Sequence, residues 1–556
     1  MRNSSSALAR HLPHLPAVLI VTVTMLLPLA VLIIYGFTSF EDGQRTVSLK
    51  PLARVLTDSI YWQALGNTVG ISLLATLVAT VLGTALGWLF GRTDLPKATL
   101  LEQLATLPIF IPPFVGAVAW TLLAAPRIGA FNVGLRNLGL PEVLDIYTPG
   151  GMAWVIGIYL APYVMMMVAG ALRSMDPSLE EAARVSGLDG VRTATRITLP
   201  LIAPAILSGA VLAFTIAIGL FGTPVVLGWA KQILLLTSRI WIAAQAVPPD
   251  YAAMAILAIY LIALSLIANG LQRWLLGGRS FVTVTGKGFR PHAIALGRTR
   301  GPCLALVGFY LLLTVAAPLA ILIAACLSTY TWSGRFTLGN VAEIAGSADV
   351  WDTLKNSIWI SVVSASITLV LGLEIAWLAN RTKLRGRRLL ETLALVPVSV
   401  PGIAFGVGVM FLWLHAPIDV YGTAWVIILA FVGRFTAYAI RPIGASLMQV
   451  HPELEESARV AGYGWLRTLI HITLPLIRPS IVASWILLFS IFMTELSMVV
   501  LLYSANTRTF SVLSFETWST GIFSVLAGLS ILQLLVGASI MLFVRRLFGS
   551  RALSNS

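Results

Sequence analysis

Long apolar segments recur along the whole chain, and they set the strongest limit on its fold. An α-helix needs about 20 consecutive apolar residues to cross the hydrocarbon core of a bilayer. Hydrophobic residues make up 58% of the chain and charged residues 11%, far from the balance of a soluble globular domain. We therefore predict an all-α integral membrane protein with about 12 transmembrane helices, six in each half. We expect kinks or breaks in the proline-containing spans 104–125 and 204–230. The predicted spans are residues 16–37, 65–91, 104–125, 151–173, 204–230, 252–275, 302–327, 356–379, 393–415, 423–447, 479–503 and 523–545.

The distribution of basic residues predicts how the chain lies in the membrane. It carries 37 Lys and Arg against 23 Asp and Glu, a net charge of +14. An even number of spans places both termini on one side, and about 24 of the 37 basic residues fall on that side. Because cytoplasmic loops are rich in Lys and Arg, we expect both termini in the cytoplasm. The charge thus reports orientation in lipid, and we expect no nucleic-acid partner.

A polar segment in the first half returns in the second. Residues 176–206 align without a gap on residues 451–481, and about 18 of these 31 positions are identical. Both copies contain a Glu-Glu pair, a glycine several residues later, and the sequence Ile-Thr-Leu-Pro. A helix that crosses a bilayer needs no such polar segment, so the two copies indicate a duplicated docking surface.

The repeat extends beyond this segment and divides the chain. Residues 67–112 match residues 356–401 at an offset of 289, whereas the polar segments match at 275, so the first half has a net 14 extra residues. We place them mostly in the outer loop 126–150. Five spans per half repeat, and the first and seventh look like additions. The predicted segments are a signal-anchor helix with outer loop (1–60), a first domain (61–275), a basic cytoplasmic linker (276–301), an extra helix with outer loop (302–350), a second domain (351–546) and a C-terminal tail (547–556).

Each polar segment predicts a short helix at the cytoplasmic face. Pro177 and Pro452 suit a first helical turn, where a missing N–H costs nothing, and Asp176 can cap that turn. Gly187 and Gly462 offer a stop with positive φ about ten residues later. Such a helix is roughly 15 Å long, too short to cross a bilayer. A single charged loop of this kind would be an ordinary solvated surface helix, and its duplication favours docking.

The pattern Glu-Ala-Ala, three residues, Gly, and then Ile-x-Leu-Pro resembles the cytoplasmic loop of binding-protein-dependent ABC importer permeases of the type I fold. The resemblance implies that the short helix couples to a groove on a separate ATPase subunit. The second copy departs from the pattern at Ser457, which is small enough to keep a close packing surface. The residues to which we assign ATPase coupling are Glu180, Glu181, Ala182, Ala183 and Gly187, within loop 176–200, and Glu455, Glu456, Ser457, Ala458 and Gly462, within loop 451–475.

Other segments resemble double-length permeases of ferric-iron-type importers: residues 221–228, 248–251, 494–497 and 501–503. Relatives with this layout also import 2-aminoethylphosphonate or thiamine, and single-length relatives import polyamines. The resemblance implies a permease subunit in the bacterial inner membrane, with 61–275 and 351–546 as permease domains. It also implies two copies of an ABC ATPase beneath it and an extracytoplasmic solute-binding protein above. Ferric iron is the solute that the resemblance favours most.

Two charged residues fall near the middle of predicted spans. Glu495 and Arg434 lie where a charge costs about 2.5–3.5 kcal/mol on insertion scales. Two alternatives follow: the residues border the translocation pathway, or they form a structural pair without solute contact.

We assign no catalytic, cofactor or metal site. No group of His, Cys, Asp and Glu has the spacing of metal ligands. There is no G-x-x-x-x-G-K-[ST] loop, since Phe281 stands where the first glycine would be, so ATP hydrolysis is expected in a separate protein. An ion-coupled secondary transporter is the alternative function, because it too can show two repeats and membrane carboxylates. A membrane enzyme would need a convergent His/Asp/Ser group that the sequence lacks.

Overall fold

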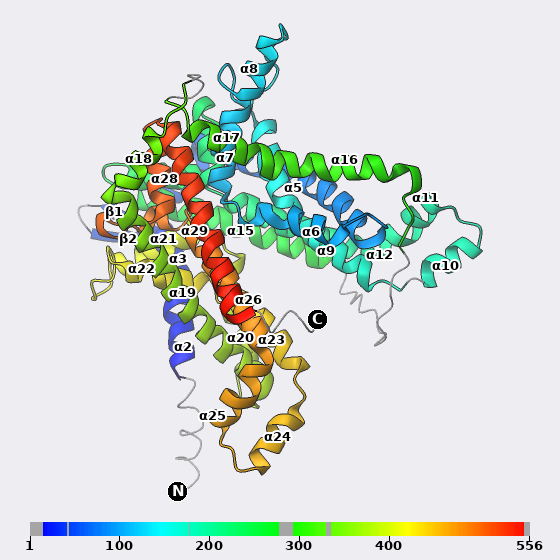
Figure 1. Cartoon of the computed structure of the whole chain (residues 1–556). Coiled ribbons are helices and arrows are strands. Elements are labelled where there is room, and N and C mark those ends of the chain that lie inside the picture. The colour runs from blue at the N-terminus through cyan, green and yellow to red at the C-terminus, as the bar shows by residue number, and fades with distance from the viewer. Residues whose placement is uncertain (1–14, 42–43, 177, 277–292, 330–334, 550–556) are drawn as a thin grey trace.

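The computed structural model describes residues 15–549 except 42–43, 177, 277–292 and 330–334. Most of the linker predicted at 276–301 and of the tail predicted at 547–556 therefore lies outside the described residues, as do residues 1–14. The described chain is almost entirely helical (Figure 1). Its one two-stranded sheet pairs β1 with β2 in antiparallel register, from Thr38 opposite Val47 to Glu41 opposite Gln44.

The first half runs from α2 to α15. Its elements are α2 (Leu15–Val21), η2 (Thr22–Leu26), α3 (Leu27–Gly36), β1 (Thr38–Glu41), β2 (Gln44–Val47), α4 (Lys50–Thr57), α5 (Ser59–Arg92), α6 (Ala98–Thr106), η3 (Leu107–Phe110), α7 (Pro113–Ala124), α8 (Ala130–Asn137), α9 (Pro149–Ser174), α10 (Ser178–Val185), α11 (Gly190–Thr193), η4 (Ala194–Thr198), α12 (Leu199–Gly219), α13 (Gly222–Gly228), η5 (Trp229–Lys231), α14 (Leu236–Gln245) and α15 (Tyr251–Leu276).

The second half follows a similar order, with α22 and α23 in the place of α9. Its elements are η6 (Gly297–Thr299), α16 (Arg300–Leu311), η7 (Leu312–Ala316), α17 (Ala317–Cys326), α18 (Gly339–Gly346), α19 (Ala348–Arg381), α20 (Arg387–Leu395), η8 (Val396–Ser399), α21 (Gly402–Leu414), α22 (Ala424–Phe435), α23 (Ala437–Gln449), α24 (Pro452–Val460), α25 (Trp465–Thr468), η9 (Leu469–Thr473), α26 (Leu474–Thr494), α27 (Val499–Leu502), η10 (Ala505–Thr507), α28 (Phe510–Ser519) and α29 (Phe523–Gly549).

Each of the twelve predicted spans overlaps a long apolar helix or a bent helix pair. Within the described residues, nine helices are long and apolar enough to cross a membrane, and four bent pairs raise the count to as many as thirteen. The predicted break in span 104–125 lies between η3 and α7, where the helix axes differ by 96°. The break expected in span 204–230 lies after Gly219. The bounds of this span need correction, because residues 222–231 belong to a new bent pair with residues 236–245.

The repeat covers six spans in each half. α2, η2 and α3 have the same order as α16, η7 and α17, and both groups lead to a short helix, α4 or α18. The first and seventh spans, which the sequence comparison left outside the repeat, are therefore counterparts. The offset falls from 289 between the starts of α7 and α21 to 275 between the starts of α9 and α22. The extra residues of the first half thus lie in the predicted loop, where they form α8, which projects from the body (Figure 1).

Four segments of π-helix have a common cause. η2, η4, η7 and η9 each end two residues before a proline, at Pro28, Pro200, Pro318 and Pro475. Proline has no N–H to donate, and its ring clashes with the carbonyl four residues earlier. A wider π turn carries the helix past this clash without breaking it. The sequence thereby fixes how side chains just before each proline are turned.

The first helix of each half packs on the other half. α3 lies against α21, and η2 lies against α22, while α17 lies against α7. At Gly433 an added Cβ would collide with the carbonyl of Thr24, so a glycine is needed for this close approach. Each half therefore packs against the first helix of the other half, and these contacts join the two halves into one body.

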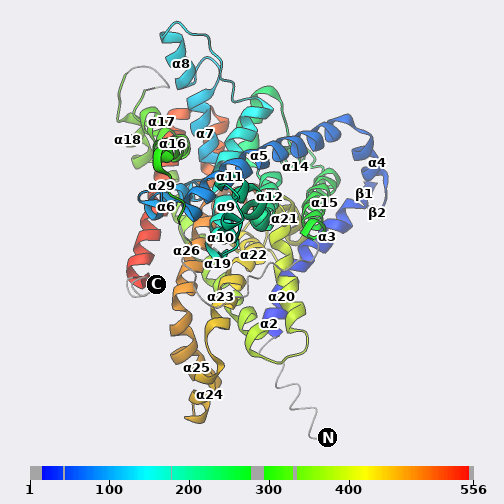
Figure 2. The same ribbon diagram turned by 90° about the vertical axis from the view of Figure 1, so that its right-hand side faces the viewer.

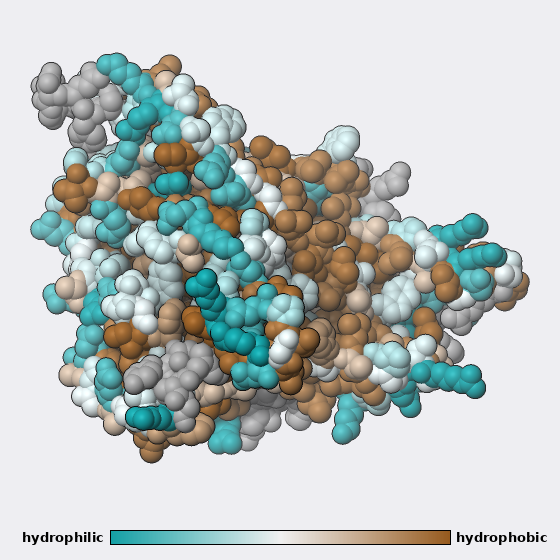
Figure 3. Space-filling model, turned by 90° about the horizontal axis from the view of Figure 1, so that it is seen from above, coloured by the Kyte–Doolittle hydropathy of each residue, from teal (hydrophilic) through white to brown (hydrophobic). Residues whose placement is uncertain are grey.

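α5 and α19, each 34 residues long, are the longest helices of the two halves. α5 packs along α9 through Gly83, Gly87 and Gly91, which are spaced by four residues and so lie on one face of the helix. On the outside, exposed apolar side chains suit contact with lipid. Figure 3 shows apolar side chains over a broad part of the surface. Exposed apolar side chains include Leu306 and Phe309 of α16 and Leu312 of η7.

Candidate functional site

The two polar repeats form matching helical hairpins at separate tips of the molecule. We call the segments 176–200 and 451–475 the coupling hairpins; they contain α10, α11 and η4 in the first and α24, α25 and η9 in the second. In Figure 1 the first hairpin lies at the far right and the second at the bottom. In Figure 2 α24 and α25 again form the lower tip. α7 and α28 lie at the end away from both hairpins (Figure 1).

Local sequence explains where the short helices begin and end. Asp176 Oδ1 accepts the N–H of Ser178 at 2.9 Å, as a capping residue does. Gly187 and Gly462 both have φ +85°, the left-handed conformation that glycine adopts without steric cost. In each copy the residue after the glycine donates its N–H to the carbonyl of Ala183 or Ala458, at 3.0 and 2.9 Å. These are Schellman ends, and the predicted stop at both glycines is confirmed.

In the first hairpin, Glu180 points into the protein. Its carboxylate receives Arg92 Nη2 from the last residue of α5, and Thr198 Oγ1 of η4 donates to it at 2.6 Å. Only 5% of the Glu180 side chain and 2% of the Arg92 side chain are exposed. Arg92 Nε and Nη1 are also buried, and they have no hydrogen-bond partner among the described residues. The buried charge of Arg92 is therefore paired with a single carboxylate, that of Glu180.

The second hairpin contains an equivalent group, but its arginine has additional hydrogen-bond partners. Arg381 ends α19, and its Nε lies 3.4 Å from Glu455 Oε1, which also accepts Thr473 Oγ1 at 3.1 Å. In addition, Arg381 Nη2 donates to the carbonyls of Leu447 and Val450, at 2.7 and 2.6 Å. The arginine of the second half thus has backbone partners that Arg92 lacks. We call the two groups, Arg92–Glu180–Thr198 and Arg381–Glu455–Thr473, the buried triads.

The structure divides the predicted coupling residues into an inward and an outward set. The inward set comprises one glutamate and one alanine from each copy: Glu180, Ala183, Glu455 and Ala458. The outward set is exposed: Glu181, Ala182, Gly187, Glu456, Ser457 and Gly462. Ser457, which departs from the family pattern, is therefore at an exposed position of the isolated chain.

Two exposed apolar positions in each hairpin were missed from the sequence. Val185 and Val460 are both 90% exposed, and they occupy equivalent positions at the ends of α10 and α24. Leu179 and Leu454, also equivalent, are 46% and 48% exposed. Exposed apolar side chains that recur at the same places of a repeat mark an interaction surface. The sequence does contain a signal for this surface, because Leu179 aligns with Leu454 and Val185 aligns with Val460 in the two polar segments.

The side chains of Arg434 and Glu495 each form a hydrogen bond with the backbone where a helix is interrupted. Arg434 Nε donates to the carbonyl of Val400 at 3.1 Å, in the break between η8 and α21. Glu495 directly follows α26, rather than lying in mid-span as predicted, and its Oε1 accepts the N–H of Met498 at 3.1 Å. Within the described chain no ion pair joins them, although atoms of both lie within 4 Å of the position that a Cβ on Gly402 would occupy. Both side chains are partly exposed.

The equivalent place in the first half is apolar. Tyr159 and Leu220 stand where Arg434 and Glu495 stand in the second half, at the offset of 275. They line a small cavity together with Ile111 and Pro113, which border the matching break before α7. At this pair of equivalent breaks, the second half therefore carries charged side chains where the first half carries Tyr159 and Leu220.

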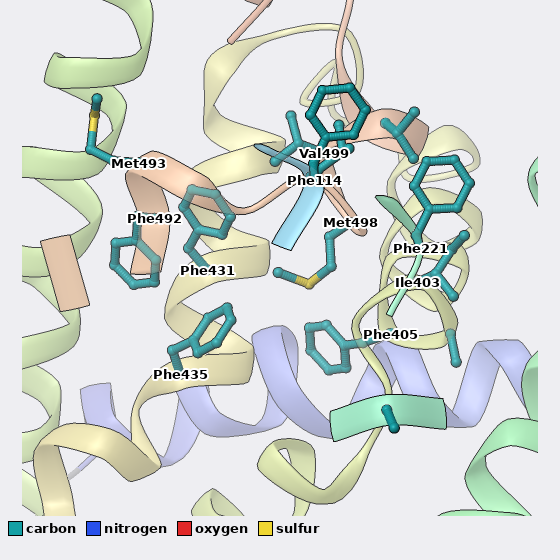
Figure 4. Close-up of a cluster of buried hydrophobic side chains, with 14 of the residues drawn as sticks. Phe114, Phe221, Ile403, Phe405, Phe431, Phe435, Phe492, Met493, Met498 and Val499 are labelled. Atoms are coloured by element: carbon teal, nitrogen blue, oxygen red, sulfur yellow. The ribbon is translucent and has the colours of Figure 1, made fainter. Parts of the chain in front are cut away.

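Aromatic residues pack around these breaks and join the two halves. Figure 4 shows Phe431, Phe435 and Phe492 on one side of Met498, with Phe114 and Phe221 of the first half near Val499 and Ile403. Phe431 and Phe492 stack with ring centroids 4.5 Å apart. Phe515 of α28 contacts Phe114, Phe221 and Trp241 of the first half, with centroids 6.2, 5.4 and 5.5 Å apart.

No group of three or more His, Cys, Asp or Glu side chains that could hold a metal ion occurs in the part of the chain that the structure describes.

Comparison with protein families gives one match that occurs twice. The model of the family described as binding-protein-dependent transport system inner membrane component matches residues 79–278 and 368–551. Each match begins within α5 or α19 and includes one coupling hairpin.

Individual relatives cover most of the chain or one half of it. The putative ferric transport system permease protein FbpB 1 of Haemophilus influenzae is 28% identical, over 85% of this chain and 75% of its own. The ferric transport system permease protein FbpB of Actinobacillus pleuropneumoniae is 26% identical, over 93% and 75%. The molybdenum transport system permease protein ModB of Escherichia coli is 30% identical, over 40% and 95%. Among solved structures, a bacterial ABC transporter involved in alginate import aligns with a TM-score of 0.40 and 16% identity, over 46% of this chain and 98% of its own.

Proposed function

Because the chain belongs to the family of binding-protein-dependent transport system inner membrane components, we propose that its two coupling hairpins bind two copies of a separate ATPase subunit. The chain is a multi-pass inner-membrane permease subunit of an ABC importer. ATP hydrolysis takes place in the partner, and an extracytoplasmic solute-binding protein delivers the solute at the opposite face. In this arrangement both termini and both hairpins are cytoplasmic, and residues 61–275 and 351–546 are the two permease domains.

The observation that carries the proposal is the matched outward face of the hairpins. Val185 and Val460 are equally exposed at equivalent positions. Glu181 and Glu456 are exposed beside Ala182 and Ser457, small side chains that allow a partner to approach closely. A duplicated surface of this kind suits a partner that is itself present twice. It has no use in an ion-coupled secondary transporter, which needs no motor subunit.

The proposed cycle moves the hairpins. Closure of the ATPase pair on ATP draws the two hairpins together, and each movement passes through η4 or η9 into α12 or α26, which continue the same helix. At the other end, Phe515 and its aromatic partners in the first half hold the two halves in contact. Separation of this contact opens the pathway to the outside, so the halves alternate between inward and outward access.

We place Arg434 and Glu495 on the pathway. Both are partly exposed at helix breaks, where half-helix ends commonly form solute sites in transporters. Arg434 Nε donates to the carbonyl of Val400, and the guanidinium lies over the Phe435 ring, with Cζ 4.7 Å from the ring centroid. Uptake by the Glu495→Gln variant tests this placement. Unchanged uptake at equal abundance would remove Glu495 from the pathway and leave it as a helix cap.

Ferric iron is the solute that we propose. Two relatives named as ferric transport permeases match 85% and 93% of the chain. Relatives named for 2-aminoethylphosphonate and molybdenum transport match only 41% and 40% of the chain, about the length of one of its two halves. Solutes of the 2-aminoethylphosphonate, thiamine or polyamine type are the alternatives to be measured beside iron.

Uptake into proteoliposomes tests the function. The permease is reconstituted with its ATPase and its solute-binding protein, and entry of radioactive ferric iron is followed with ATP or with an ion gradient as the energy source. Uptake that requires ATP and both partners is expected. Uptake by the permease alone, driven by an ion gradient, would instead establish the secondary transporter.

A pair of variants tests the hairpin surface in the same assay. Val185→Asp and Val460→Asp place a charge on the proposed contact, so we expect each to lose the ATPase during purification and to lower uptake by about tenfold or more. Val47→Asp is the matched control, because Val47 is 88% exposed in β2, far from the hairpins. Equal retention of the ATPase by all three variants would contradict the proposed docking surface.

A further inference from the structure

The buried triads have a geometry that docking alone does not explain. Glu180 and Glu455 belong to the motif whose resemblance implies contact with the ATPase, yet their side chains are only 5% and 9% exposed. Each instead joins three elements: the end of the long helix, the short helix, and the π turn that leads into the next span. A buried charge is retained where it is paired and hydrogen-bonded. The carboxylates are therefore turned toward the permease itself.

The triad is a major attachment of the first short helix to its permease half. α10 packs mainly against α11 and η4, within its own hairpin. The Arg92–Glu180 pair links α10 directly to α5, which is 34 residues long and packs along α9 and α12. The Thr198 hydroxyl adds a link to η4, the start of the helix that continues into α12.

We propose that Glu180 and Glu455 are positioning residues that lock each coupling helix to the end of the long helix, so that movement at the ATPase turns the whole permease half. This inference rests on the proposed function and assigns the two glutamates of the motif different tasks. The outward Glu181 and Glu456 meet the partner, while the inward Glu180 and Glu455 transmit the movement. Arg92, Arg381, Thr198 and Thr473 complete the two locks.

The two locks differ in a way that makes the inference testable within one molecule. Without the Glu180 charge, Arg92 is left as a buried cation with no ionic partner, because Nε and Nη1 already lack hydrogen bonds. Without the Glu455 charge, Arg381 keeps the carbonyls of Leu447 and Val450. Loss of a partner costs most where the remaining charge stays buried and unpaired. The first lock is therefore the more sensitive to loss of its carboxylate.

The experiment measures solute taken up per ATP hydrolysed, in the reconstituted complex of permease, ATPase and binding protein. Glu180→Gln keeps the size of the side chain and removes its charge, and we expect uptake per ATP to fall about tenfold, within the range by which residues on a coupling route change it. For Glu455→Gln we expect a fall of about two- to threefold. The matched control is Asp352→Asn, which removes the charge of an exposed carboxylate in α19, outside both hairpins. It is expected to leave retention of the ATPase and uptake per ATP near the wild-type values.

Rescue and a second variant keep the test decisive. Glu180→Asp retains the charge and is expected to recover part of the uptake per ATP. Should Glu180→Gln fail to assemble, Thr198→Val removes only the hydroxyl link and is expected to lower the same ratio. Wild-type uptake per ATP in assembled Glu180→Gln, or in Thr198→Val where that variant decides, would overturn the inference. Absence of ATP-dependent uptake by the wild-type complex would instead overturn the proposed function, so the two failures are distinguishable.

Discussion

Single residues decide how the hairpins are shaped, and the two glycines at their ends show this most simply. Gly187 and Gly462 share the same positive φ, and an added Cβ would meet no other atom within 4 Å at either position. Glycine is therefore required at these positions by the backbone conformation, and not by a lack of space for a side chain. A side chain at positive φ costs about 1–2 kcal/mol, and more when it is branched at Cβ.

Valine at these glycines should disturb the turn. We expect Gly187→Val and Gly462→Val to displace the residues that follow the short helix, and so to lower uptake per ATP while the spans stay folded. Uptake and ATP hydrolysis in proteoliposomes measure the effect. Gly190→Val and Gly464→Val are matched controls, since those glycines also have open surroundings but lie outside the positive-φ set. Equal uptake per ATP in all four variants would show that the turn conformation is irrelevant to coupling.

Local sequence predicted these residue-scale features because caps and glycine stops depend on neighbours within a few positions. The short helices and their ends followed from the cap at Asp176 and from the two glycines. The direction in which Glu180 points was beyond such reasoning, since its partner Arg92 lies 88 positions away. Both residues were visible as members of the repeat, but only the fold brings them together. The same holds for Glu495, whose span ended one residue before it.

At the scale of elements, the π turns connect the hairpins to the membrane. η4 and η9 precede Pro200 and Pro475, and they turn Thr198 and Thr473 toward the buried glutamates. Hydropathy alone located the spans, because about 20 apolar residues suffice to identify one. It did not place the interruption after Gly219 or predict α13 as a separate helix, because buried non-helical backbone needs partners from other elements.

Replacement of Pro200 should reveal the task of the π turn. Pro200→Ala removes the cause of the wide turn, so η4 is expected to return to α-helical spacing and to rotate Thr198 away from Glu180. We expect uptake per ATP to fall several-fold, without loss of thermal stability, since alanine is the better helix former. Pro204→Ala is the control, because Pro204 lies in the same helix beyond the π turn. A lower uptake per ATP in both variants alike would mean that the π turn has no special part.

The whole molecule is held together by exchanged first helices and by aromatic contacts between the halves. The hydropathy pattern and the repeat predicted two related six-span halves, and the family match and the helix order support that architecture. Neither predicted that α3 packs on α21 and α17 on α7. All these helices are apolar over most of their surface, and periodicity therefore cannot tell which neighbour each one prefers. The glycine at 433, opposite Thr24, was one local sign of the crossing.

For the whole molecule, we expect the two coupling hairpins to approach each other when ATP binds to the assembled importer. Val185 and Val460 are suitable reporter positions, as they are equivalent and 90% exposed in the free chain. Cys303 and Cys326, the cysteines of the chain, are first replaced by serine and alanine. Spin labels at 185 and 460 then report the separation of the hairpins in the reconstituted complex. Retention of the ATPase and uptake by the labelled complex are the necessary controls.

The measurement that tests this claim most directly is the spin-label distance between positions 185 and 460, with and without ATP, in a complex whose hydrolysis is blocked. We expect a distribution that shifts to clearly shorter distances when ATP is bound. A distance that stays the same with bound ATP, in a complex that carries out ATP-dependent uptake when hydrolysis is allowed, would contradict it.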